Sequence, residues 1–209
     1  VTAQCINGAD CVAYSYDADG LITAAGNLTL TLATQQGGVL TATQLGNISS
    51  VLEHNDFAEL NSVTSRFNSQ PLHSMALVRD NLGRITRKTE IVGADTVVSD
   101  YHYNSNGRLY KVVRNGDTIE YAFDANGNRL SKTNSSGVVS ASFDAQDRLL
   151  THGDCSYSYS GNGELQQKQC GDAITEYQYD VFGNLQSVVL PSTGPGAGEE
   201  AKTIGYLVD

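Results

Sequence analysis

The sequence predicts an all-β protein in which tandem β-hairpins form a coiled antiparallel sheet. A pattern of the type Tyr-x-Tyr-Asp-x-x-Gly-x-Leu recurs along the chain with a mean step of about 20 residues, the length of one supersecondary unit. The 209 residues include 21 Gly and 11 Tyr but no Trp, a composition that favours strands and tight turns. Charged residues make up only 17% and hydrophobic residues 40%, which argues against a disordered chain.

Each copy of the pattern has the chemistry of a hairpin. Tyr-x-Tyr places two rings on one face of a strand, because side chains alternate with a period of two. An Asp at the first turn position, which we call the anchor, can cap free backbone N–H groups, and a Gly three residues later can adopt the left-handed conformation that closes the turn. The residues assigned to these turns are Asp17, Gly20, Asp80, Gly83, Asn104, Gly107, Asp124, Gly127, Asp144, Asp180 and Gly183.

In chain order, the first predicted element is a hairpin at residues 1–13. Near the other end of the chain, residues 192–200, which are rich in Gly and Pro, are predicted to form a flexible loop between strands. Two degenerate copies follow the first clear one, with Gln35 and Asn55 as anchors, and Ser160 is the anchor of a later copy. Apolar residues between positions 48 and 67 also fit one face of a helix, so a short helix is the alternative for that segment. We expect about nine repeats in one domain that spans residues 1–209.

The four cysteines form two pairs. Cys5 and Cys11 flank an Asn-Gly turn, whereas Cys155 and Cys170 lie almost symmetrically about the turn at residues 160–163. Hairpins would bring both pairs onto adjacent strands, where a single bulge residue decides whether the second pair reaches bonding distance. We predict two disulfides, with four reduced thiols as the alternative; zinc is disfavoured because the ligand spacing is wrong. Disulfides would place the protein outside the cytosol, secreted, at a cell surface or in a periplasm.

Charge and motifs narrow the classes of function. The net charge of −10 disfavours nucleic acid and anionic membranes as partners, and no apolar run approaches the ~20 residues of a membrane span. Most Asp residues occupy turn positions, the four His are scattered, and no phosphate-binding loop occurs. We therefore expect no enzyme activity, no catalytic or metal-binding residues and no cofactor.

Two recurring residue types are candidates for binding. The rings of Tyr101, Tyr103, Tyr177 and Tyr179 are candidate glycan contacts through stacking. Arginines recur just after the turns and could pair with Asp in adjacent repeats, with an anionic glycan as the alternative partner; these are Arg84, Arg108, Arg129 and Arg148.

The repeated pattern, of which Asp124-Ala-Asn-Gly-Asn-Arg129 is an especially typical copy, resembles the YD repeats of Rhs proteins, which also occur in Tc toxin shells and teneurins. The resemblance covers nearly the whole chain and implies a strip of β-sheet that spirals into a hollow shell or barrel. In bacterial relatives such shells commonly enclose a toxic domain, and in teneurins they serve adhesion. No Asp-Pro pair, around which the family's self-cleavage segment is built, occurs in this sequence.

We accordingly expect a non-catalytic, exported structural scaffold, part of an Rhs-type shell or extracellular assembly that encapsulates or presents a toxin domain encoded elsewhere. The alternatives are a cell-surface adhesin or carbohydrate-binding module that uses Tyr and Arg faces and, third, a glycoside-cleaving enzyme. About nine repeats are too few to close such a shell, and the strand edges of an isolated strip invite pairing. The expected partners are therefore further YD repeats of the same or another chain, or copies of this chain through self-assembly.

Overall fold

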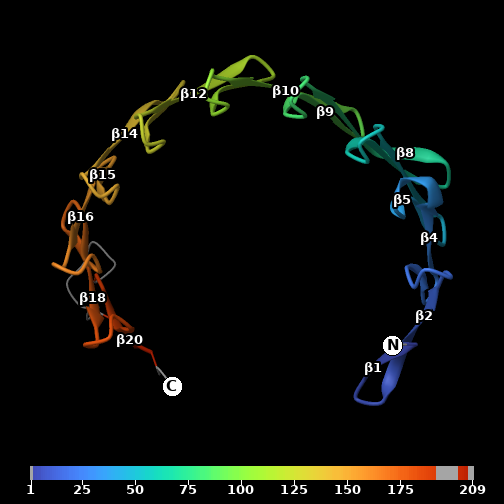
Figure 1. The fold of residues 1–209 in the computed structure, drawn as a ribbon, viewed down its shortest axis with the longest axis horizontal. Coiled ribbons are helices and arrows are strands. Elements are labelled where there is room, and N and C mark those ends of the chain that lie inside the picture. The colour runs from blue at the N-terminus through green and yellow to red at the C-terminus, as the bar shows by residue number, and fades with distance from the viewer. Residues whose placement is uncertain (1, 192–201, 207–209) are drawn as a thin grey trace. The chain divides into compact units, whose positions relative to one another are not determined.

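The computed structural model describes residues 2–191 and 202–206, so the predicted loop at residues 192–200 lies outside the described residues. The all-β class and the hairpin repeats are confirmed, because the described chain consists of twenty strands and one three-residue 3-10 helix. The chain divides into two compact units, residues 1–118 and 119–209, which we describe separately (Figure 1).

In each unit, consecutive strands pair antiparallel. The strands of the N-terminal unit are β1 (Ala3–Ile6), β2 (Ala9–Tyr16), β3 (Ile22–Ala25), β4 (Leu28–Ala33), β5 (Val39–Leu45), β6 (Ile48–His54), β7 (Leu60–Phe67), β8 (Gln70–Arg79), β9 (Ile85–Val92), β10 (Asp95–Tyr103) and β11 (Leu109–Arg114). Strand β12 (Asp117–Phe123) crosses the boundary between the units. It is followed by β13 (Arg129–Asn134), β14 (Gly137–Phe143), β15 (Leu149–His152), β16 (Cys155–Tyr159), β17 (Leu165–Cys170), β18 (Ala173–Tyr179), β19 (Leu185–Leu190) and β20 (Lys202–Gly205).

The structure decides between strand and helix for residues 48–67: this segment forms β6 and β7, so the helical alternative is wrong. Its apolar residues Leu52 and Val63 lie directly opposite each other across the hairpin, a pairing that a helix would not allow. The one described helix, η1 (Thr34–Gln36), lies in the loop between β4 and β5. None of the described segments is a helix long and apolar enough to cross a membrane.

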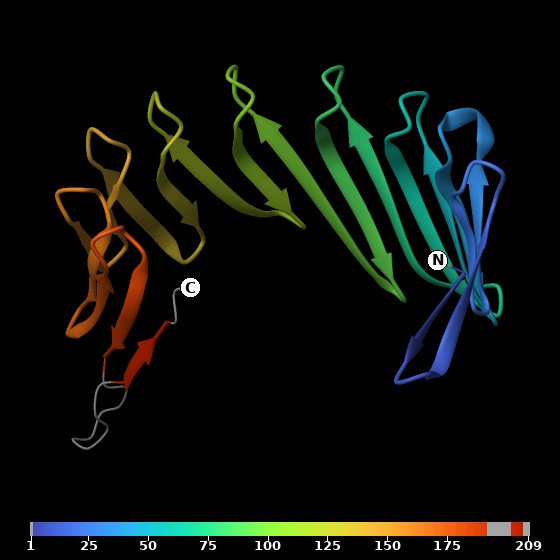
Figure 2. The ribbon, with the colours of Figure 1, turned by 60° about the horizontal axis from the view of Figure 1, so that its bottom comes forward.

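The strands of each unit lie side by side as one layer, with turns at both ends of the hairpins (Figure 2). Because no second layer covers either face, only Ser99 and Val188 among the described residues are buried, with 4% and 7% of their surface exposed. The accessible surface of the chain is 14295 Å², compared with about 9,400 Å² expected for a compact monomer of this mass. Residues 2–191 and 202–206 therefore form no conventional hydrophobic core.

The two faces of the sheet differ in composition. Residues directly opposite each other in an antiparallel pair lie on the same face, so the register assigns every strand residue to a face. The aromatic face carries the Tyr-x-Tyr side chains and apolar cross-strand pairs such as Tyr101 with Val112 and Tyr177 with Val188. The opposite face carries polar pairs, of which Ser156 with Gln169 is an example. The repeat pattern thus builds an aromatic face and a polar face, but the separation is incomplete: Ser50 and Ser65 lie on the aromatic face, and Val51 and Val78 lie on the polar face.

Candidate functional site

The anchors form eight turns of one kind. At residues 17, 55, 80, 104, 124, 144, 160 and 180, the anchor N–H donates to the carbonyl four residues later, and the N–H three residues later donates back to the anchor carbonyl. A side-chain oxygen of each anchor accepts two further backbone N–H groups, one of them always from the residue four positions later. A bulge next to the turn accompanies each hairpin. Side-chain capping therefore explains why Asp, Asn and Ser can all serve as anchors.

Three positions depart from the turn pattern: Gln35 at an anchor position, and Ala58 and Asp147 at the position of the turn Gly. Gln35 lies within η1 and does not cap a turn of this kind, so that degenerate copy was misassigned: the Gly-Gly pair at residues 37 and 38, both at positive φ, closes a wider loop. Asp147, like Ala58 in the Asn55 turn, stands where the other capped turns have Gly, and both adopt φ 61°. The Oδ1 of Asp147 accepts hydrogen bonds from the side chains of Asn126 and Asn128 in the preceding turn, at 2.9 and 2.6 Å. The replacement of Gly by Asp147 thus links two neighbouring turns.

In six of the eight turns, the residue four positions after the anchor complements the anchor chemically; the other two turns have Leu21 after Asp17 and Arg108 after Asn104. Arg84 Nε donates to Asp80 Oδ2 at 2.8 Å, and Arg148 Nε donates to Asp144 Oδ2 at 2.7 Å. Where the anchor is Asn55, the residue four positions later is Glu59, whose Oε2 accepts from Asn55 Nδ2 at 2.7 Å. In these six turns an Asp anchor is followed by a donor, whereas the Asn55 and Ser160 anchors are followed by an acceptor.

Hydrogen bonds to the ionised form lower the pKa of four anchor carboxyls. The side chain of Arg84 is the main cause for Asp80, and the backbone N–H of Arg148 for Asp144. The side-chain amides of Asn128 and Asn184 lower the pKa of Asp124 and Asp180, respectively. These carboxyls are therefore capping groups held in their charged form, the opposite of the raised pKa that a catalytic acid requires.

Successive repeats are joined by a contact that we call the clamp. It links the residue four positions after one anchor to the residue just before the next anchor. Arg84 stacks over Tyr103 at 4.6 Å, and the Tyr103 hydroxyl donates to the carbonyl of Ile85 at 2.8 Å. The same geometry recurs for Arg148, Tyr159 and Leu149, at 5.1 and 2.9 Å. These arginines pair with the Asp of their own turn, so the expectation that they pair with Asp in adjacent repeats is wrong for them.

The clamp between the Asn55 and Asp80 turns has the reverse chemistry. Arg79 occupies the Tyr position and Glu59 the Arg position, with Nε and Oε2 3.6 Å apart. Arg79 Nη2 donates to the carbonyl of Leu60 at 3.1 Å, the equivalent of the Tyr hydroxyl bond, and Nη1 donates to the carbonyl of Gly83 at 2.9 Å. Sequence reasoning missed this clamp, although the alignment of anchors places both residues at the clamp positions.

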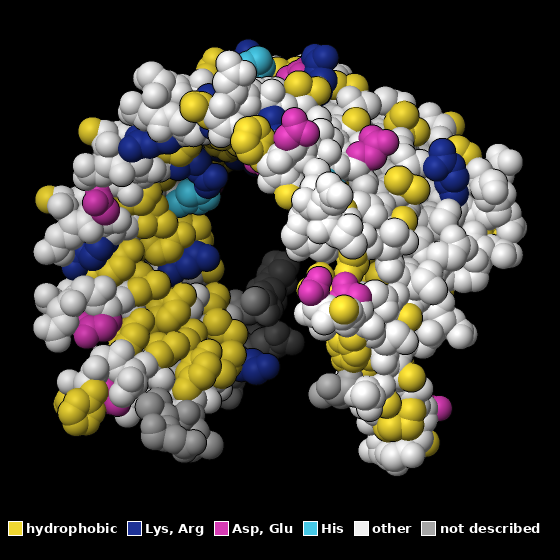
Figure 3. Space-filling view, turned by 45° about the vertical axis from the view of Figure 1, so that its right-hand side comes forward, with side chains coloured by type: hydrophobic (Ala, Val, Ile, Leu, Met, Phe, Trp, Pro, Cys, Tyr) yellow, Lys and Arg dark blue, Asp and Glu magenta, His cyan; other side chains and the backbone are white. Residues whose placement is uncertain are grey.

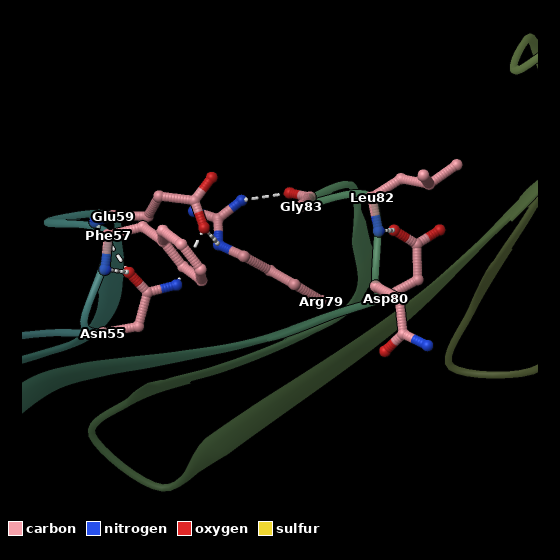
Figure 4. A pocket seen from close by; sticks show the side chains of 8 residues that line it. Asn55, Phe57, Glu59, Arg79, Asp80, Leu82 and Gly83 are labelled. Atoms are coloured by element: carbon pink, nitrogen blue, oxygen red, sulfur yellow. Dashed lines mark hydrogen bonds and ion pairs between the residues drawn. The ribbon is translucent and has the colours of Figure 1, made fainter.

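A cavity of about 600 Å³ lies beside this clamp, between the turns at Asn55 and Asp80 (Figure 4). Phe57 and Leu82 line it and are 85% and 77% exposed, whereas the guanidinium of Arg79 points toward Glu59 and Gly83. The polar groups of Arg79 and Asp80 are already engaged in the Asp80 turn, where Arg79 donates to the carbonyl of Gly83 and Asp80 accepts from the N–H of Arg84. No group of three or more His, Cys, Asp or Glu side chains that could hold a metal occurs within residues 2–191 and 202–206.

The four candidate glycan tyrosines lie on the aromatic face, two in each unit. The hydroxyl of Tyr103 and one side of its ring are engaged in a clamp. Tyr101 lies opposite Val112, and Tyr177 opposite Val188. Burial raises the pKa of the Tyr179 phenol, with smaller contributions from Tyr177 and Glu164. Tyr103 is thus committed to the repeat structure and is less available to a ligand than Tyr101 or Tyr177.

Both cysteine pairs form disulfides, Cys5 with Cys11 and Cys155 with Cys170. The bulge between Ser158 and Tyr159 shifts the register by one residue and places Cys155 directly opposite Cys170. The bulge therefore brings the second pair into alignment.

Comparison with known proteins identifies the repeat architecture. A family model described as the teneurin YD-shell matches residues 6–193, about nine-tenths of the chain. A comparison with curated protein sequences gives no significant match.

Two solved structures show the same fold at low sequence identity. The crystal structure of TcdB2-TccC3-TEV aligns with 86% of this chain at 12% identity and a TM-score of 0.52. A structure of the Photorhabdus luminescens Tc holotoxin pore with a substituted TccC3 aligns with 92% at 13% identity and a TM-score of 0.55. The chain spans only 12% and 14% of the lengths of those two chains.

Proposed function

Because the chain belongs to the teneurin YD-shell family, we propose that it is a non-catalytic wall segment of a larger shell. The observation that carries this proposal is the single-layer sheet, in which Ser99 and Val188 are the buried residues of the described chain. A wall that extends from repeat to repeat needs lateral contacts and no closed core. The eight capped turns and the clamps supply such contacts.

The wall continues by edge pairing. Within the described residues, β1 pairs only with β2, and β20 only with β19, so each strand has a free edge that can template another strand. We propose that further YD repeats, of the same or another chain, pair there. Two disulfides support export to an oxidising compartment, and the fold shared with a Tc holotoxin structure supports a shell that encloses or presents a toxin domain.

Light scattering tests edge pairing directly. The N–H of Tyr206 bonds to β19, and alternation along the strand directs the N–H of Thr203 toward the open edge. We expect the chain to self-associate with increasing concentration, and Thr203→Pro to reduce association because proline removes the exposed donor. Thr203→Val is the matched control. A mass of 22.3 kDa at every concentration would contradict edge pairing.

The alternative function is carbohydrate binding by the aromatic face. A glycan array with the wild-type chain and the variants Tyr101→Ala and Tyr177→Ala tests it, since these rings are not used in a described clamp. Specific binding that both substitutions abolish would replace the scaffold proposal with an adhesin, whereas a blank array would remove the alternative.

A further inference from the structure

Charged side chains in the strands of the C-terminal unit are segregated by face. The described strand residues from position 119 onward include four cations and two carboxylates. Lys132 lies directly opposite Tyr121, and Lys168 directly opposite Tyr157, so both lysines are on the aromatic face. Arg129, whose guanidinium lies 5.7 Å from the ring centre of Tyr121, and Lys202, opposite Leu190, share that face. The carboxylates of Glu120 and Glu176 lie on the polar face, opposite Thr133 and Gln167.

Among the strand residues of this unit, the aromatic face carries cations without carboxylates; Glu164, which contributes to the raised pKa of the Tyr179 phenol, lies in a turn. Figure 3 shows hydrophobic side chains gathered along one face of the C-terminal unit, with Lys and Arg among them. None of the ion pairs formed within the described residues includes Lys132 or Lys168. On the aromatic face of the N-terminal unit, by contrast, Lys88 is neutralised by Glu90 at 2.8 Å. The lysines on the aromatic face of the C-terminal unit are therefore unneutralised, in a chain whose net charge is −10.

We propose that the aromatic face of the C-terminal unit binds an acidic polypeptide segment in which apolar and carboxylate side chains alternate. Rings such as Tyr121 and Tyr157 offer apolar contact area, and Lys132 and Lys168 beside them pair with the carboxylates of the partner. A second copy of the same face would bring like charges together, which disfavours self-pairing. The aliphatic neighbours of the tyrosines, among them Val188 and Ile204, favour apolar side chains of a polypeptide over a sugar or a nucleotide chain.

Fluorescence anisotropy tests this proposal with a dye-labelled peptide that repeats Glu-Leu-Glu-Ser and with its counterpart in which Lys replaces Glu. We expect the full 209-residue chain to bind the acidic peptide only, and more weakly at high salt because exposed charges are screened. Lys132→Gln with Lys168→Gln should weaken binding about tenfold, given that one exposed ion pair contributes up to about fivefold. Lys132→Arg with Lys168→Arg should retain it.

The matched control removes two cations that already have partners. Arg87→Gln with Lys88→Gln changes the net charge by the same amount, but Arg87 is paired with Asp100 and Lys88 with Glu90, so we expect less than a twofold effect. Equal binding of both peptides, an equal loss in the control variant, or binding of polygalacturonate or oligothymidylate in place of the acidic peptide would overturn the proposal. The result does not depend on edge pairing, because none of these substitutions lies in β1 or β20.

Discussion

Removal of the Arg79 side chain should destabilise the sheet at the clamp between the Asn55 and Asp80 turns. Arg79→Ala deletes hydrogen bonds to the carbonyls of Leu60 and Gly83, at 3.1 and 2.9 Å, and the ion pair with Glu59 at 3.6 Å. A hydrogen bond from a charged donor contributes about 1.5 kcal/mol, and an ion pair with a partner as exposed as Glu59 about 0.5 kcal/mol. The expected loss is therefore about 3.5 kcal/mol, concentrated at the junction of these two repeats.

The clamps also predict a specific rescue. Arg79→Tyr alone places a phenol against the Glu59 carboxylate, and we expect a loss of about 2 kcal/mol. Adding Glu59→Arg and Asn55→Asp reproduces the residue set found at Asp80, Arg84 and Tyr103, and we expect stability within about 1 kcal/mol of wild type. The Asn-Glu-Arg set and the Asp-Arg-Tyr set would then be interchangeable as whole units. The free-energy effects of the three substitutions would not be additive, as is usual for residues in contact.

Hydrogen exchange with mass spectrometry, combined with urea unfolding followed by circular dichroism, measures both effects. Exchange should increase in β7 and β8 for the single variants and return to wild-type rates in the triple variant. Arg66→Ala is the control, because Arg66 lies in β7 and takes part in none of the described ion pairs. A triple variant no more stable than Arg79→Tyr alone would refute the clamp as the link between these repeats.

Three further predictions concern capping, cross-linking and a second clamp. The pKa of Asp124 is lowered in the folded state. Its contribution to stability is therefore present above the unfolded pKa of about 3.9 and is lost as pH falls through the folded value. Acid titration followed by circular dichroism should show that Asp124→Asn loses less stability at low pH than the wild type. Reduction of Cys155–Cys170, which closes a loop with a sequence separation of 15, should lower the unfolding free energy by about 3 kcal/mol, with Cys155→Ser as a control that is insensitive to reductant at this loop. Tyr159→Phe removes only the hydroxyl bond to Leu149 and should cost about 1 kcal/mol in urea unfolding, whereas an unchanged midpoint would show that ring stacking alone maintains that clamp.

The register of the hairpins could be predicted from the sequence because it depends on local chemistry. An anchor such as Asp80 caps its own turn through bonds to residues two and four positions later, so the information lies within five consecutive residues. The same reasoning failed at Gln35, where a Gly-Gly pair was aligned to the pattern but no capping side chain exists at the first position. Local capping, rather than glycine content, is the reliable signal of this turn.

The clamps could not be predicted in the same way, because they join residues about 10 to 20 positions apart. The sequence shows Arg84 and Tyr103 as separate recurring features, and only the register of neighbouring hairpins brings the guanidinium over the ring. The role of Arg79 was still harder to predict, since it replaces the aromatic residue that defines the pattern. Its role becomes visible only when Glu59 is seen to have changed together with it.

The lack of a core changes what the aromatic face means for stability. In a two-layer protein the apolar face of a sheet is covered by the same chain, whereas here the accessible surface exceeds that of a compact monomer by about half. Capping and clamps order each hairpin relative to its neighbours, but they act at the turn ends and leave the middle of the strands uncovered. Covering the aromatic face is therefore the largest remaining source of stability, so a ligand of that face should protect β16 to β18 from hydrogen exchange more strongly than it protects the turns.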